Sequence, residues 1–185
     1  MSTTLDPHAT IRPLLRTRQV REFTDEPVDP AAVDALADAA RWSGSSQNTQ
    51  PWRFVVLRKS ETLARLAELG APHTRSLRTA AAAVAIVLPA EPGRAVSHAF
   101  DEGRAAERIL VAASMLGLAA GIGWVRSEVR PAVGELLGLP EDRFVRTIVA
   151  IGRPTPQARK PKKPRGEARL PREDTVFEER WPEPR

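Results

Sequence analysis

The chain contains no cysteine and no tyrosine, and aromatic residues make up only 5% of its 185 positions. Without cysteine it can form no disulfide, no thiolate nucleophile and no cysteine-ligated metal site, and this composition fits a reducing cytoplasm. The lack of tyrosine removes one common general acid. Three histidines, His8, His73 and His98, are scattered without the spacing of metal ligands, so we expect no metal site.

Long hydrophobic runs are also missing. The longest apolar run extends from Ala80 to Leu88, which is too short to cross a bilayer. The first residues lack the basic and apolar regions of a signal peptide. We therefore expect a cytoplasmic protein with no membrane association.

The length and an apolar content of 42% predict one domain over residues 1–185. Residues 1–10 are expected to be an N-terminal extension, and residues 153–185 a basic, proline-rich C-terminal arm. Residues 153–172 hold eight basic side chains against one acid, but no aromatic residue on which a nucleic acid base could stack. We interpret this run as a solvated arm that supplies one or two phosphate ligands, with no nucleic acid partner.

The spacing of apolar residues predicts the secondary structure. Asp29 and Pro30 are typical of a helix start, and Ser60 is expected to cap a further helix that ends at Gly70. An alanine-rich stripe, which allows close helix packing, predicts a long helix from about Ser97 to Ala120. Helices outnumber the roughly four expected strands without a regular alternation, so the predicted class is α+β. The predicted helices are 30–43, 60–69, 97–120 and 127–137, and the clearest strands are 53–57, 84–88 and 144–151.

A polar loop, Ser-Gly-Ser-Ser-Gln-Asn-Thr-Gln-Pro-Trp at residues 43–52, separates the first of these helices from the first strand. Its hydroxyls, amides and glycine supply short donors and acceptors with freedom to turn, which suits a flat, polar ligand. The alternative is a connector without a role. Ahead of the helix, Arg16, Arg18 and Arg21 are expected to lie on one side of an extended stretch.

These segments resemble the FMN-dependent nitroreductase family. Its members open with an Arg-Arg-Ser-x-Arg-x-Phe segment, matched here by residues 17–23, and carry a Pro-Ser-x-x-Asn-x-Gln-Pro-Trp loop, matched by residues 44–52. Further likeness follows in order at residues 101–113, 116–118, 121–124, 144–154 and 169–177. Five or more ordered segments are much harder to obtain by chance than one short motif. Thr17 and Gln19 stand where an arginine and a serine are common, and the stretch 89–97 is short for a helical flap.

The resemblance implies a mixed or antiparallel sheet of four to five strands flanked by helices, and a homodimer with the C-terminal arm exchanged between subunits. It also implies FMN as cofactor and NADH or NADPH as electron donor. No catalytic side chain is expected, because the flavin N5 carries the chemistry. Arg21 would give electrostatic support at the pyrimidine edge of the flavin, and Arg18, with Thr17, Gln19 and Arg169, would hold its phosphate. The remaining expected cofactor contacts are Gly123 and Trp124 at the reactive edge and, from the neighbouring subunit, Ser45, Ser46, Asn48 and Gln50.

The implied activity is a ping-pong transfer of hydride from NAD(P)H through the flavin to a small-molecule acceptor such as a nitroaromatic or a quinone. Two alternatives remain at this stage. The same fold includes a branch that consumes reduced FMN to make dimethylbenzimidazole, which residues 123–125 also resemble. The other alternative is a flavin-binding or basic-tail interaction protein without turnover.

Overall fold

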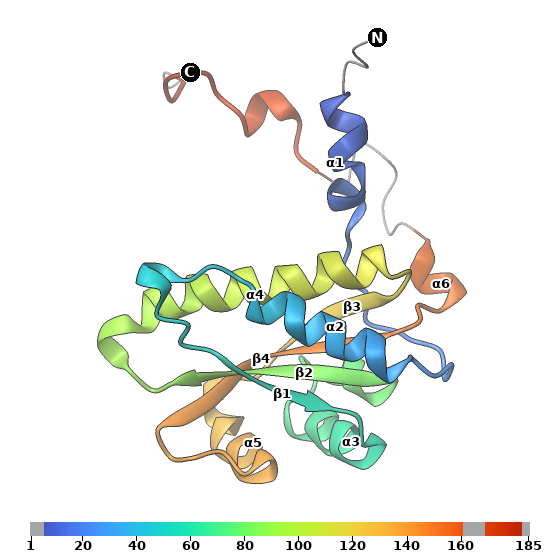
Figure 1. Ribbon diagram of the computed structural model, residues 1–185, viewed down its shortest axis with the longest axis vertical. Coiled ribbons are helices and arrows are strands. Elements are labelled where there is room, and N and C mark those ends of the chain that lie inside the picture. The colour runs from blue at the N-terminus through green and yellow to red at the C-terminus, as the bar shows by residue number, and fades with distance from the viewer. Residues whose placement is uncertain (1–5, 161–168, 183–185) are drawn as a thin grey trace.

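The protein is described by a computed structural model over residues 6–160 and 169–182. Its centre is a four-stranded antiparallel sheet with the order β1-β2-β4-β3 (Figure 1). The strands are β1 Arg53–Leu57, β2 Ala82–Pro89, β3 Ala119–Trp124 and β4 Arg143–Gly152. The predicted α+β class is confirmed, and the sheet has four strands, all antiparallel.

Helices cover both faces of the sheet (Figure 1). On one face α2 Pro30–Arg41 and α4 Ala95–Met115 pack over the strands, and on the other lie α3 Ser60–Leu69 and α5 Arg130–Leu137. Two further helices are α1 Pro7–Arg16 and the single turn α6 Pro156–Arg159. Single 3₁₀ turns occur at Ser46–Asn48, Arg75–Arg78, Pro92–Arg94, Ser127–Val129 and Arg172–Asp174. Within the described ranges, none of the helices has the length and apolar character that a membrane span requires.

Strand β2 lies between the two halves of the hydrophobic core, and every one of its residues is buried. Successive side chains point to opposite faces of a strand, so Val84, Ile86 and Leu88 join the cluster under α2 and α4. Ala83, Ala85 and Val87 join the cluster under α3 and α5. A central strand buried on both faces explains why this stretch reads as a continuous apolar run.

The end of α4 differs from the prediction. The alanine stripe predicted a helix to Ala120, but α4 ends at Met115, and Ala119 and Ala120 belong to β3. Gly117 has a φ of 68°, a left-handed conformation that glycine adopts without strain, and the Leu118 amide returns to the Ala113 carbonyl at 2.8 Å. Pairing with β4 therefore overrides the helical periodicity.

Two helix starts also differ from expectation. Ser60 is the first helical residue of α3 rather than its cap, because the cap position is Lys59 and no side chain caps the helix. Residues 7–10, expected to be part of an extension, lie in α1, whose cap Asp6 accepts a hydrogen bond from the His8 amide at 3.0 Å. Arg16, expected in an extended segment, is the last residue of α1. The pair Asp6-Pro7 is the same start signal as Asp29-Pro30.

The connection from β2 to α4 is short. Strand β2 ends at Pro89, one 3₁₀ turn spans Pro92–Arg94, and α4 begins at Ala95.

Helix α1 and the C-terminal segment 169–182 stand away from the body (Figure 1). Lys162, Lys163 and Arg165 of the basic run lie outside the described residues.

Candidate functional site

The free edge of β3 is partly covered by the segment after α1. The Val20 amide donates to the Ala120 carbonyl at 2.9 Å, and Gln19 forms a parallel bridge with Ala120. The side chain oxygen of Gln19 accepts from the Ile122 amide at 3.3 Å. A Cβ at Gly121 would overlap the Val20 carbonyl oxygen, so this close approach requires glycine. Gln19 thus lies beside the first part of β3, and its expected contact with the FMN phosphate stays a prediction.

The same edge leaves backbone groups open beyond Ile122. Adjacent residues of an antiparallel strand direct their amide groups to opposite sides. Because the Ile122 amide points to the free edge, the Trp124 amide points there too, and Gly123 faces β4. A Cβ at Gly123 would lie 3.5 Å from the His73 carbonyl oxygen and from the Thr74 Cα, so segment 73–74 packs closely against this part of β3. The Trp124 side chain is half exposed.

The arginines of the N-terminal segment turn to different partners. Arg21 donates to the side chain oxygen of Gln19 at 3.2 Å and so lies toward the edge of β3. Arg18 instead donates to the carbonyl oxygens of Arg159 at 2.7 Å and Lys160 at 3.3 Å. The prediction that these cations lie on one side is therefore wrong, because Arg16 is helical and Arg18 and Arg21 diverge. Thr17 closes α1 through its hydroxyl, which donates to the Pro13 carbonyl at 3.1 Å.

A small basic cavity lies beside Arg18. It has a volume of about 210 Å³, and Arg16, Arg18 and Arg159 contribute its cationic walls. Guanidinium groups bind phosphate oxygens with charge-assisted hydrogen bonds, so these residues suit a phosphate monoester. Arg169 belongs to the C-terminal segment that stands off the body (Figure 1), and its place in a phosphate site stays a prediction.

The polar loop is held in a strained conformation. Gln47, Asn48 and Gln50 have φ values of 50°, 54° and 47°, the left-handed region that favours glycine. The Ser45 hydroxyl accepts from the Gln50 amide at 2.9 Å, and the Gln50 side chain donates to the Asn48 side chain oxygen at 3.3 Å. Residues 46–50 are exposed. A left-handed residue other than glycine costs about 1–3 kcal/mol and persists only where the surrounding structure holds it. The hydrogen bonds of Ser45 and Gln50 contribute to holding this loop in one shape.

Helix α4 anchors this loop from below. Both carboxylate oxygens of Asp101 lie 3.1 Å from the Ser46 amide nitrogen, and Arg108 donates to the Trp42 carbonyl at 2.8 Å. The Arg104 guanidinium lies against Gly44, where a Cβ would overlap it. Sequence analysis missed Asp101 as a support. The sequence feature that could have indicated this role is the position of Asp101 four residues before the buried Ala105, on the same face of the helix.

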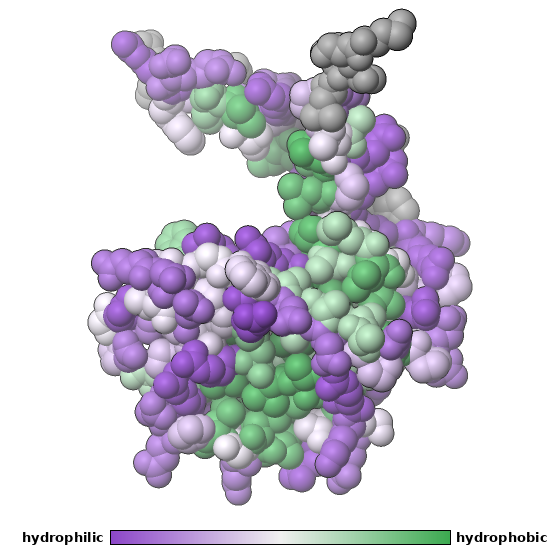
Figure 2. All heavy atoms as spheres, in the orientation of Figure 1, coloured by the Kyte–Doolittle hydropathy of each residue, from purple (hydrophilic) through white to green (hydrophobic). Residues whose placement is uncertain are grey.

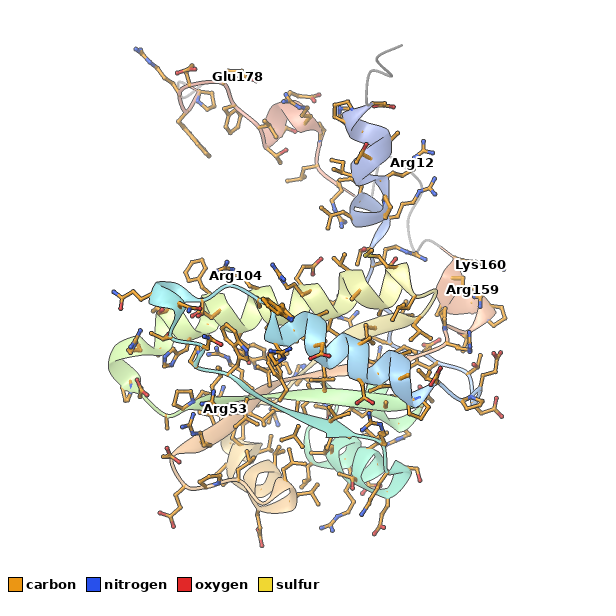
Figure 3. The ribbon with its side chains drawn as sticks, in the orientation of Figure 1. Arg12, Arg53, Arg104, Arg159, Lys160 and Glu178 are labelled. Atoms are coloured by element: carbon orange, nitrogen blue, oxygen red, sulfur yellow. The ribbon has the colours of Figure 1, made fainter. Side chains whose placement is uncertain are left out.

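The loop and the basic cavity lie toward opposite ends of α4. Ser46 is anchored at Asp101, whereas Leu110 and Ser114 line the cavity with Arg18. Ser114 lies thirteen positions after Asp101 in the helix, a distance of roughly 20 Å along the axis. Figure 3 shows the same separation, with Arg104 near one end of α4 and Arg159 and Lys160 near the other. One chain therefore does not bring Ser45, Ser46, Asn48 and Gln50 together with Arg18.

A buried ion pair supports Trp124. Arg146 is the residue skipped by a bulge in β4, since Ile86 pairs with Thr147 and Val87 with Val145. Bulges re-aim side chains, and Arg146 reaches the Glu102 carboxylate of α4 with an Nε to Oε2 distance of 2.7 Å. Its guanidinium carbon also lies 5.7 Å from the ring centre of Trp124. The same pair affects the neighbouring Arg130. The pKa of Arg130 is lowered, mainly because burial disfavours its charged form and also because the positive charge of Arg146 is near, while the negative charge of Glu102 opposes this shift.

Comparison with known proteins identifies the family to which the chain belongs. The model of the nitroreductase family matches residues 14–86. A protein of Archaeoglobus fulgidus, provisionally named a NADH dehydrogenase/NAD(P)H nitroreductase, is 32% identical over 146 residues, which cover 74% of this chain and 80% of the relative. A protein of the same provisional name from Streptomyces coelicolor is 29% identical over 192 residues, covering 89% of this chain and 95% of the relative. The chain belongs to the nitroreductase family.

Solved structures agree with this fold. An FMN-dependent nitroreductase from Clostridium difficile superposes with a TM-score of 0.79 at 24% identity, covering 92% of this chain and 99% of that chain. The NADPH:FMN oxidoreductase from Vibrio harveyi, solved in complex with NAD+, has a TM-score of 0.79 at 25% identity and covers 95% of this chain and 79% of that chain. The architecture is the nitroreductase fold.

Proposed function

We propose that this protein is an FMN-dependent oxidoreductase that takes hydride from NADH or NADPH and passes it to a small acceptor such as a nitroaromatic or a quinone. The observation that carries the proposal is the contact of the Arg18–Arg21 segment with β3. Gln19 links the Arg21 guanidinium to the Ile122 amide, which leaves a cation and open backbone groups along one strand edge. Family membership supports the same conclusion.

The residues present fit FMN. Gly121 permits the N-terminal segment to lie against β3, and the alternation of the strand presents the Trp124 amide at the open edge, where a flat heterocycle needs hydrogen-bond partners. The cavity of Arg16, Arg18 and Arg159 suits the terminal phosphate. The Thr17 hydroxyl and amide both donate to carbonyls of α1, and the Gln19 side chain is bonded to β3. Of these two residues, Gln19 would therefore contribute its backbone amide to the phosphate.

FMN supplies hydride acceptance and donation at N5, and the protein supplies binding, orientation and electrostatics. Arg21 acts through its charge. A fixed cation at the pyrimidine edge stabilises negative charge that develops there, and it stabilises neutral oxidised flavin less. Trp124, supported by Arg146, borders the reactive edge and limits the space for donor and acceptor.

A second copy of the chain would complete the site. The polar loop and the basic cavity lie too far apart in one chain to hold the same FMN, so the loop would serve the flavin of the neighbouring subunit. An apolar groove of about 770 Å³ along α4 supports the pairing, and Phe100 and Met115 at its walls are 73% and 74% exposed. Covering such side chains contributes about 25 cal/mol per Å² of apolar surface.

The C-terminal arm would add to this dimer. Strand β1 has a free edge, because it ends the sheet order, whereas segment 19–20 covers part of the β3 edge. The apolar residues 54–56 of β1 are half-buried, and Figure 2 shows an apolar patch on the lower part of the body, in the region of β1. A groove of about 650 Å³ lies beside β1, lined by Trp52, Phe54 and Val56 together with charged residues such as Asp38 and Arg41. The arm of the partner, with exposed Val176 and Trp181, would pack there and extend the sheet.

The test begins with the purified protein. Released flavin is identified by mass, and the flavin spectrum is followed anaerobically while NADH or NADPH is added, then candidate acceptors. Bleaching by a nicotinamide and recovery with a nitroaromatic or quinone support the proposal. FAD, or no flavin after reconstitution with excess FMN, overturns it. A bound FMN that no nicotinamide reduces indicates a flavin-binding protein, and consumption of reduced FMN indicates the dimethylbenzimidazole branch.

A further inference from the structure

We infer that Asp101 of α4 is a positioning residue that sets the shape of the polar loop for FMN binding. The inference rests on the proposed function and concerns a residue buried beneath the loop, not one of the expected flavin contacts. Asp101 is only 2% exposed, and its two oxygens lie 3.1 Å from the same Ser46 amide nitrogen. A hydrogen bond to an ionised group is about twice as strong as a neutral one.

The hydrogen bond from the Ser46 amide to Asp101 lies where the left-handed part of the loop begins. Ser46 begins the 3₁₀ turn, and the next residues, Gln47 and Asn48, adopt the left-handed conformation. The carbonyl of Ser46 in turn accepts from the Thr49 amide and hydroxyl, each at 3.0 Å. Fixing Ser46 therefore fixes the base of the strained segment.

A buried carboxylate is costly unless it is paired, and Asp101 has a partial counterion. Arg104 lies 3.7 Å from Asp101 and also packs against Gly44, at the other side of the loop base. Arg104 is more than half exposed, whereas the carboxylate is buried under the loop. The base of the loop is thus held by a buried carboxylate and its counterion, so a change at Asp101 acts directly on the geometry of the exposed residues 46–50.

The test compares Asp101→Ala with Asp101→Asn and with Ile109→Val, a core substitution on the same helix. Each purified protein is stripped of flavin and titrated with FMN, and the visible circular dichroism of the saturated protein is recorded. We expect the FMN dissociation constant to rise at least about tenfold in Asp101→Ala, with an altered dichroism band. Asp101→Asn retains one acceptor oxygen, so its affinity should lie between. Ile109→Val should match the wild type in both readouts.

The outcomes are distinct. Wild-type protein that binds no FMN would overturn the proposed function itself. Wild-type protein that binds FMN while both Asp101 variants bind within twofold of it would overturn only the role of Asp101. The same holds if Ile109→Val loses as much affinity as Asp101→Ala, since the effect would then reflect stability. If Asp101→Ala does not fold, Asp101→Asn decides, and an unchanged affinity and dichroism band in that variant contradict the inference.

Discussion

Glu102 and Arg146 form a buried ion pair that joins α4 to the bulge of β4. Their side chains are 4% and 16% exposed. Removing one partner of a buried pair leaves the other charge without compensation, at a cost of about 3–5 kcal/mol. We expect Glu102→Ala to lower the free energy of unfolding by this amount, measured by urea denaturation of the holoprotein. Glu102→Gln should cost less, because it keeps a hydrogen-bond acceptor.

Asp38→Asn is the matched control for this pair. It removes the partner of Arg41 in an ion pair whose side chains are 61% and 66% exposed. Exposed pairs contribute about 0–1 kcal/mol, so the control should change stability little. Equal effects of Glu102→Ala and Asp38→Asn would contradict the structural role of the buried pair.

Gly121 is predicted to be required for contact between the N-terminal segment and β3. A methyl group there would overlap the Val20 carbonyl, so Gly121→Ala should push residues 18–21 off the strand and reduce both FMN retention and stability. Gly134→Ala is the control. Gly134 lies inside α5, and a Cβ there would have the Leu139 side chain as its neighbour at 4.0 Å, which is an ordinary van der Waals contact. That change should be neutral or stabilising by about 0.5–1 kcal/mol. Flavin absorbance per protein after gel filtration measures the outcome.

The sequence predicts local features of this fold better than contacts between distant residues. The apolar run of β2 and the Asp29-Pro30 start of α2 depend on neighbouring residues, so their patterns are visible without the fold. Strand β3, with the sequence Ala-Ala-Gly-Ile-Gly-Trp, has little intrinsic strand preference and forms because β4 pairs with it. Its first two residues were therefore mistaken for helix.

The candidate site follows the same rule: features that depend on neighbouring residues are predictable from the sequence, and contacts between distant residues are not. The polar loop and the segment 17–23 stand out by composition and family likeness, and both lie within the described part of the chain. The directions of Arg18 and Asp101 were not predictable, because their partners lie 141 and 55 residues away. The partners are backbone groups, carbonyls for Arg18 and an amide for Asp101, and backbone groups leave no mark on composition. Acids such as Asp101 and Glu102 on an alanine-rich helix face are the one signal that a search for buried polar groups could use.

Deletion of residues 165–185 tests the C-terminal arm. If the arm covers β1 of the partner, its removal exposes that edge and should weaken the dimer and flavin binding together. Light scattering gives the mass of the truncated protein, and absorbance gives its flavin content. A truncated protein that remains a monodisperse dimer with full FMN would show that α4 alone supports assembly.

Arg21 and Arg18 are predicted to differ in the kind of effect that their removal has. Arg21 lies toward the strand edge through Gln19, whereas Arg18 lies against α6 beside the basic cavity. Arg21→Ala removes a cation that stabilises the charge of the reduced pyrimidine edge, so it should lower the two-electron potential of bound FMN by about 30 mV or more, equivalent to about 1.4 kcal/mol. Arg18→Ala should instead weaken FMN binding through the phosphate and leave the potential of the bound flavin nearly unchanged. Potentiometric titration of both variants, saturated with FMN, separates the two roles. An unchanged potential in Arg21→Ala would mean that another group faces the flavin ring.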